Sequence, residues 1–129
     1  MSGVQEVAFS LSDFRGRYLV LVFYSGDWEP AAHDVLTSFS GLRDRFSAAG
    51  CELAACSTDS PKVHKSWIKT ESEDGGFSGQ LSIPLWSDPS GHLASQFDLF
   101  DAEECQCLDG VVVIDDEGIV RHAMTTSME

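Results

Sequence analysis

The feature that most constrains the fold is an unbroken apolar run at residues 18–24, with the sequence YLVLVFY. Its β-branched and aromatic residues favour a strand, and its length suits one. Because it lacks the polar alternation of a strand with one wet face, we expect a central strand buried on both faces. It is also far shorter than the ~20 residues that a membrane-spanning helix needs. The run therefore predicts a sheet with helices on both sides.

Helix and strand signals alternate after this run. Pro30 suits a first helical position, and apolar residues then recur at three- and four-residue steps up to Gly50, a residue typical of the position after a helix. Residues 51–57 form a second short apolar run. Ser60 and Pro61 then offer an N-cap and a first-turn proline for another helix. The predicted order is strand, helix, strand, helix.

The second half of the chain predicts shorter elements. Residues 81–86 predict a strand in which Pro84 marks an edge or an irregularity, and residues 88–91 open a short helix. A β-hairpin is predicted over residues 111–124, because an acidic turn separates two apolar runs there. This order indicates one α/β domain over residues 1–129. A thioredoxin-like fold, a central mixed sheet with flanking helices, fits it best, and a flavodoxin-like sheet is the alternative.

Composition excludes several classes of partner. The chain has 8 lysines and arginines against 21 aspartates and glutamates, a net charge of −13. Such an acidic surface repels phosphate backbones and anionic headgroups, so we expect no binding to nucleic acid or membrane. The N-terminus lacks the basic and long apolar regions of a secretory signal. Four unevenly spaced cysteines do not make a disulfide framework, so we expect reduced thiols in a cytoplasmic, or also nuclear, protein.

Short motifs along the chain match one family in order. They are Asp59-Ser60-x-x-x-His64-x-x-Trp67-Ile68-x-Thr70, then Gly75-Gly76, then Leu81-x-Ile83-Pro84-Leu85-x-x-Asp88, with Val20 to Tyr24 before them and Ile114-Asp115-x-x-Gly118-x-x-Arg121 after them. Through these residues the chain resembles the typical two-cysteine peroxiredoxins of the alkyl hydroperoxide reductase and thiol-specific antioxidant type, over roughly residues 8–122. The resemblance implies a thioredoxin fold and, in ordinary members, reduction of peroxides by a cysteine thiolate.

The catalytic positions that this resemblance implies hold other residues here. Counted on from the run at residues 18–24, the family's proline, threonine and peroxidatic cysteine fall on Ser25, Glu29 and Ala32, and its arginine falls on Asp109. An alanine side chain cannot ionise or attack an O–O bond, and no cysteine occurs in the first 50 residues. We therefore expect a pseudoenzyme without thiol peroxidase activity, with no cofactor and no metal.

Negative charge makes the same positions unsuitable for a thiolate. Carboxylates at Glu29 and Asp109 would face a site that should hold an anion, and two like charges at ~5 Å cost about 3 kcal/mol at an effective dielectric near 20. That repulsion would raise the pKa of a thiol by roughly two units. Ala32→Cys alone is therefore not expected to restore peroxidase activity.

The resemblance also implies that the domain is shortened at both ends. The family's N-terminal hairpin is largely missing, and the last helix and the arm with the resolving cysteine are absent. A sheet without one covering helix exposes apolar surface that a partner, a dimer contact or altered local packing must hide. The alternative is that the chain is a fragment or a shortened isoform of marginal stability. We expect a non-catalytic binding or regulatory module within the antioxidant and redox-homeostasis family. Its expected partners are a second copy, as a homodimer, or active peroxiredoxins.

Cys105 and Cys107 are the remaining redox candidates. A C-x-C pair can form a strained disulfide or give two metal ligands, although the acidic neighbours of this pair would raise the thiol pKa and slow its attack. The alternative function is therefore a weak thiol–disulfide oxidoreductase or peroxidase that uses these two residues. Cys51 and Cys56 would lie on opposite faces of one strand, as buried structural thiols.

The histidines give no catalytic or metal-binding pattern. His33 stands beside Asp34, but adjacent helical residues do not face each other, so we interpret this pair as a solvated helix start. His64 is interpreted as part of the helix packing of the family. None of the histidines has the spacing of a zinc site.

Overall fold

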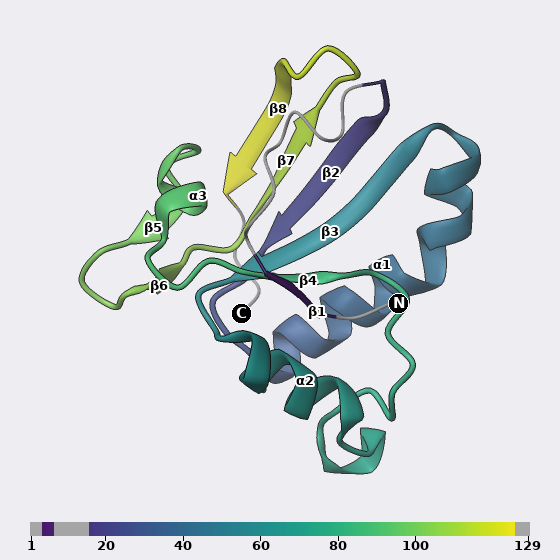
Figure 1. Cartoon of the computed structure of the whole chain (residues 1–129), viewed down its shortest axis with the longest axis vertical. Helices are drawn as coiled ribbons and strands as arrows, with labels where there is room; N and C mark the ends of the chain where they lie inside the picture. Colours follow the sequence, from purple (N-terminus) through teal and green to yellow (C-terminus); the bar gives the residue numbers. More distant parts are fainter. Residues whose placement is uncertain (1–3, 7–15, 126–129) are drawn as a thin grey trace.

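The structure, a computed structural model, describes residues 4–6 and 16–125 (Figure 1). Its strands are β1 (Val4–Glu6), β2 (Tyr18–Phe23), β3 (Cys51–Ser57), β4 (Leu85–Ser87), β5 (Phe100–Asp101), β6 (Gln106–Cys107), β7 (Gly110–Ile114) and β8 (Val120–Thr125). Its helices are α1 (Pro30–Ala48), α2 (Pro61–Lys69) and α3 (His92–Ser95), and a 3₁₀ turn covers Ser72–Asp74. Among the described residues, no helix is long and apolar enough to cross a membrane.

Six of these strands form one mixed sheet in the order β1-β4-β3-β2-β7-β8 (Figure 1). β1, β4, β3 and β2 run parallel, whereas β7 runs antiparallel to β2 and β8 antiparallel to β7. β2 therefore has a neighbour on each side, as its continuous apolar sequence predicts. The antiparallel pair at one end excludes the flavodoxin-like alternative, whose sheet is parallel throughout. The predicted thioredoxin-like fold is confirmed.

The helix boundaries follow the predicted capping residues. α1 begins at Pro30 and ends at Ala48, and Gly50 takes the left-handed conformation that suits the residue after a C-cap, with φ of 85°. α2 begins at Pro61, and the Ser60 hydroxyl accepts a hydrogen bond from the backbone N–H of Val63 at 3.3 Å.

The sheet has a core on each face, and successive residues of the 18–24 run alternate between them. The helix-side core lies under α1 and α2 and includes Val20, Val22, Tyr24, Ala32, Leu36, Leu53, Ala55 and Trp67. The α3-side core lies under α3 and the segment that follows it and includes Leu19, Leu21, Phe23, Cys56, Leu93, Leu99, Cys107 and Val112. This arrangement explains why the central run is apolar at every position.

Three short elements differ from the sequence prediction. The strand predicted over residues 81–86 begins only at Leu85, because Pro84 has no N–H to donate to a ladder. β1 adds an unpredicted edge strand beside β4, and β5 with β6 forms an unpredicted two-stranded sheet. Elements of two or three residues are too short to show a recognisable apolar period.

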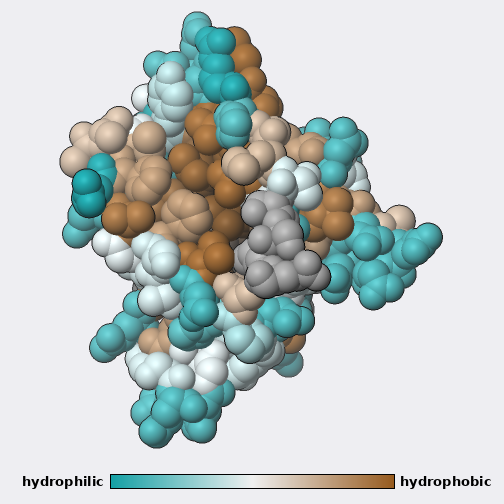
Figure 2. Space-filling view, turned by 180° about the vertical axis from the view of Figure 1, so that it is seen from behind, coloured by the Kyte–Doolittle hydropathy of each residue, from teal (hydrophilic) through white to brown (hydrophobic). Residues whose placement is uncertain are grey.

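β8 is the exposed edge of the sheet. All six of its residues are exposed, including Val120 and Met124, which are 45% and 48% exposed. Ile119, just before the strand, is 49% exposed. Figure 2 shows apolar residues running down the middle of one face from the end of the molecule where Figure 1 places the β7–β8 hairpin. This end of the sheet therefore presents apolar side chains together with a strand edge that no other described strand pairs with.

Candidate functional site

The candidate site lies where β2 ends and the chain turns into α1. Parallel β2 and β3 end side by side here, so the loop at residues 24–29 meets the loop at residues 57–60. The backbone N–H of Asp27 donates to Asp59 Oδ2 at 2.8 Å and joins the two loops. In open α/β sheets, the carboxyl ends of parallel strands are the usual place for a functional site.

Ala32, in the first turn of α1, is buried in the helix-side core and is only 2% exposed. The position that the resemblance assigns to the peroxidatic cysteine thus carries a methyl group that packs against the sheet. Position 29, the N-cap of α1, makes no side-chain capping bond. The first turn of this helix offers no thiol.

Ser25, Glu29 and Asp109 come together at the same place. The backbone N–H of Ser25 donates to Asp109 Oδ1 at 3.2 Å, across 84 residues of sequence. Partial burial raises the pKa of Asp109, and the negative charge of Glu29 raises it further, while the hydrogen bond from Ser25 lowers it. The two carboxylates are therefore close enough to repel each other, in the arrangement expected from the sequence.

Asp27 and His64 form a fully buried pair just below this loop. Their Oδ2 and Nδ1 atoms are 2.6 Å apart, and both side chains have no exposed surface. His64 Nε2 lies 3.1 Å from the carbonyl oxygen of Trp86 and must donate to it. A neutral ring then has no proton left on Nδ1, so one further proton must lie between Nδ1 and Asp27. Burial raises the pKa of Asp27, whereas the adjacent His64 lowers it.

The pair is extended by hydroxyl groups. The Tyr24 hydroxyl donates to Asp27 Oδ1 at 2.7 Å, and burial raises the pKa of Tyr24 well above its usual range, which keeps this donor protonated. The Ser57 hydroxyl donates to Asp59 Oδ2 at 2.8 Å. The result is a satisfied buried network that links the ends of β2 and β3 to α2. The sequence pattern indicates helix packing for His64 but not its partner, because Asp27 lies 37 residues away.

The sequence predicts a solvated helix start at His33, and this prediction is wrong. His33 Nε2 lies 2.7 Å from the carbonyl oxygen of Gly76, and its ring stacks on Phe77 with centroids 4.5 Å apart and planes 13° apart. Asp34 is only a distant neighbour, 3.9 Å from His33 Nδ1, and its side chain is 88% exposed. His33 therefore fastens the first turn of α1 to the loop at residues 75–77, a contact that sequence spacing could not reveal.

A groove of about 460 Å³ opens beside this contact, between α1 and the loop that follows α2. Its wall includes Ser40 and Ser82, whose hydroxyls are 2.7 Å apart. The other lining residues are His33, Thr37, Gly41, Ser72, Gly76, Phe77, Gln80 and Leu81. The groove offers hydroxyl and backbone groups that could bind a polar ligand, but it contains no thiol and no carboxylate.

The four cysteines all lie in the described part of the chain, and none lies at the start of α1. Cys51 opens β3 at the far end of the sheet, and Cys105 is exposed, with its Sγ 3.6 Å from the carbonyl oxygen of Ala102. Cys56 and Cys107 are buried in the α3-side core, on the face of the sheet opposite Ala32. The structure does not bring Cys105 and Cys107 together, because one thiol faces solvent and the other lies in the core.

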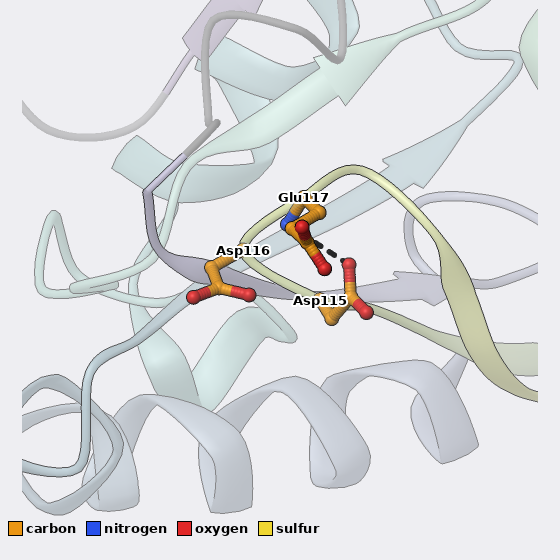
Figure 3. A group of neighbouring side chains, drawn as sticks. All are labelled: Asp115, Asp116 and Glu117. Atoms are coloured by element: carbon orange, nitrogen blue, oxygen red, sulfur yellow. Dashed lines mark hydrogen bonds between the residues drawn. The ribbon is translucent and has the colours of Figure 1, made fainter.

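A group of three carboxylates occupies the β7–β8 turn (Figure 3). One oxygen from each of Asp115, Asp116 and Glu117 lies within 4.8 Å of the others. Asp115 already accepts from the backbone N–H groups of Glu117 and Ile119, both at 2.9 Å, and from Arg121 Nε at 2.6 Å. The hydrogen bond from Ile119 is the largest of several that lower the pKa of Asp115. These bonds account for the cluster as a hairpin turn.

Comparison with known proteins places these observations in a family. The family model described as AhpC/TSA family matches residues 2–123. The chain is 38% identical over 112 residues to Peroxiredoxin-4 of Dictyostelium discoideum, covering 87% of this chain and 43% of that protein. It is 36% identical over 111 residues to Peroxiredoxin-2 of Cricetulus griseus, covering 86% and 56%. The chain thus spans about half the length of these curated relatives.

Solved structures agree with these matches. The reduced 2-Cys peroxiredoxin of Plasmodium vivax has a TM-score of 0.86 at 28% identity, covering 92% of this chain and 61% of that chain. Thioredoxin peroxidase I of Plasmodium yoelii has a TM-score of 0.81 at 34% identity, covering 93% and 68%. Prx1a of Plasmodium yoelii, modified at its N-terminus, has a TM-score of 0.82 at 34% identity, covers 92% and 68%, and is described as forming an artifactual octamer.

Proposed function

Because the chain belongs to the AhpC/TSA family, we propose that it keeps the family scaffold as a binding or regulatory module of redox homeostasis and lacks thiol peroxidase activity. The observation that carries this proposal is the buried methyl group of Ala32 at the start of α1. A peroxidase of this family needs a sulfur there, since the thiolate is the group that attacks the peroxide.

The positions of the other sulfurs support the proposal. Cys56 and Cys107 lie in the α3-side core, and Cys51 begins β3 at its other end. Cys105 is exposed in a turn, where its thiol lies 3.6 Å from the carbonyl oxygen of Ala102. The charged neighbour that acts on Cys56 is the carboxylate of Asp88, which raises the thiol pKa, whereas a reactive thiolate needs a cation beside it.

The charge at the site also supports the proposed absence of peroxidase activity. The carboxylates of Glu29 and Asp109 raise the local negative potential, and Asp109 stands where the resemblance places an arginine. A thiolate formed there would be destabilised by two anions instead of stabilised by one cation. The loss therefore extends beyond the missing sulfur to the electrostatics that would activate it.

The retained role that we propose is association, either with a second copy of the chain or with active peroxiredoxins. The edge strand β8 supports this role, because within residues 4–6 and 16–125 it pairs only with β7, and Val120 and Met124 are nearly half exposed. Edge strands of this kind readily pair with another chain. Burial of its apolar side chains would add to the stability of such a contact.

The deciding experiment is peroxide consumption with thioredoxin as the reductant. We expect the purified chain, and Ala32→Cys as well, to show no turnover above the rate without protein. The matched control combines Ser25→Pro, Glu29→Thr, Ala32→Cys and Asp109→Arg, which restores all four residue types implied by the resemblance. Turnover by the unmodified chain would refute the proposal, and turnover by Ala32→Cys alone would refute its electrostatic part.

The same assay tests the alternative function that uses Cys105 and Cys107. If the chain reduces peroxides or disulfides, Cys105→Ser and Cys107→Ser together should abolish that activity, while Cys51→Ser should not. Activity that survives the double substitution would exclude this pair as its source.

A further inference from the structure

Cys56 and Cys107 are buried thiols in one core, although they lie 51 positions apart in the chain. They are 0% and 1% exposed and belong to the same core beneath α3. Figure 1 shows β6 beside the carboxyl end of β3, which is where these two residues lie. β3 and β6 contact each other, and the Cys107 thiol is the neighbour that contributes most to raising the pKa of Cys56.

The backbone holds the two residues in this position. The Thr58 hydroxyl, just after β3, donates to the carbonyl oxygen of Cys105 at 3.3 Å. Cys107 is paired with Phe100 across the two-stranded sheet, and the next N–H, that of Leu108, donates to Leu99 at 2.7 Å. A disulfide requires two cysteine side chains that face each other at short range, and these contacts keep β6 against β3 with both side chains in one core.

We propose that Cys56 and Cys107 are oxidised by a hydroperoxide to an intramolecular disulfide that fastens β6 to β3. One thiol gives up its proton and its sulfur attacks the O–O bond, which yields a sulfenic acid and an alcohol, or water when the oxidant is hydrogen peroxide. The second sulfur then attacks the sulfenic sulfur and releases water. Overall, two S–H bonds and one O–O bond break, one S–S bond forms, and the hydroperoxide is reduced by two electrons.

This reaction is slow and stoichiometric, because a disulfide between two side chains that are 0% and 1% exposed is shielded from a protein reductant such as thioredoxin, so it does not produce the turnover tested above. The hydrogen bond with Cys107, together with burial, raises the pKa of Cys56, so little thiolate is present in the closed structure. Oxidation therefore waits for the β5–β6 segment to open, and a two-stranded sheet of two residues per strand opens at low cost. Once formed, the bond closes a long loop and stabilises the fold until a reductant cleaves it.

The test uses a variant with Cys51→Ser and Cys105→Ser, whose two remaining cysteines are the proposed pair. Both replaced residues lie outside the core, so the variant should fold. After incubation with excess hydrogen peroxide, we expect an intact mass lower by two hydrogens and a cross-linked peptide that contains residues 56 and 107. The Tm should rise by several degrees and return to its original value with a dithiol reductant.

Controls keep the outcome decisive. Adding Cys56→Ser to that variant should abolish the mass loss and the Tm shift. Since a substitution in the core can itself impair folding, the wild-type chain is mapped under the same conditions and should give the same cross-linked peptide. The proposal is overturned if both thiols remain free after treatment that oxidises Cys105 in the wild-type chain, or if the mapped disulfide joins Cys105 to Cys107.

Discussion

At the scale of single residues, the buried pair of Asp27 and His64 decides how the candidate site is held. Each atom of the pair that can form a hydrogen bond has a partner, and the Tyr24 hydroxyl completes the carboxylate side. Removing one member of such a pair leaves the other desolvated and without a partner, which costs far more than the pair itself contributes.

Asp27→Asn and Asp27→Ala should therefore behave very differently. An asparagine amide can donate to His64 Nδ1 and accept from Tyr24, so Asp27→Asn should change the free energy of unfolding by less than about 1 kcal/mol. Asp27→Ala should lower the free energy of unfolding by about 3–5 kcal/mol, because it leaves Tyr24 and His64 buried without their hydrogen-bond partner. Urea denaturation measures both values. Equal losses in the two variants would show that the network is not satisfied in the way described.

A substitution at Asp109, unlike those at Asp27, should stabilise the fold. The pKa of Asp109 is raised in the folded state by burial and by Glu29, so its ionisation opposes folding once the pH exceeds the unfolded pKa of about 4. Asp109→Asn keeps an acceptor for the Ser25 N–H and removes the charge. It should stabilise the chain by about 0.5–1 kcal/mol at pH 7, after allowance for solvent screening.

The pH dependence checks the cause of that effect. The difference in unfolding free energy between Asp109→Asn and the wild type should shrink as the pH falls from 7 to 4, because the wild-type carboxyl becomes protonated. Asp115, whose pKa is lowered, loses its stabilising contribution at acid pH in both proteins and cancels in the comparison. A difference that is independent of pH would point to packing instead of charge.

At the scale of elements, the long and strongly patterned segments could be predicted from sequence, and the short ones could not. The run at residues 18–24, the helix after Pro30, the Ser60 cap and the terminal hairpin all carry local signals that the structure confirms. β1 depends on pairing with β4, about 80 residues away, and the β5–β6 pair has only two residues in each strand, too few to carry such a signal. The same limit applies to the site, because the Asp27–His64 pair and the His33–Gly76 contact join separate elements.

The loop at residues 75–77 provides a test of how closely the elements fit. A Cβ atom on Gly76 would collide with the backbone carbonyl oxygens of Thr70 and Trp67, which cannot move without disturbing the end of α2. We expect Gly76→Ala to cost about 2–3 kcal/mol. The matched control is Gly41→Ala, since a Cβ there meets nothing and lies within α1.

That control should change stability in the opposite direction. Alanine has a higher helix propensity than glycine, so Gly41→Ala should stabilise the chain by about 1 kcal/mol. Thermal unfolding of the two variants side by side measures the contrast. If Gly76→Ala were neutral, the loop would not be packed against α2 as closely as described, and His33 would lose its fixed partner.

At the scale of the whole molecule, the exposed edge of the sheet should govern association. If β8 pairs with another copy, sedimentation should show a species of twice the 14.1 kDa chain mass that dissociates on dilution. Val120→Lys and Met124→Lys place charges on this edge and should shift the equilibrium to the monomer. Leu42→Lys, at a 38% exposed position of α1, is the matched control and should not. A monomer at all concentrations would leave β8 without this role.

The order of the strands has a further consequence for synthesis. β2 is paired on one side with β3 and on the other with β7, which begins only at Gly110. At the usual pace of a ribosome, roughly 4 to 17 s separate the emergence of Phe23 from that of its partner strand. During this interval one edge of β2, the edge that later pairs with β7, has no partner strand. Chaperones therefore have their main opportunity to bind the apolar β2 segment of the nascent chain at this stage.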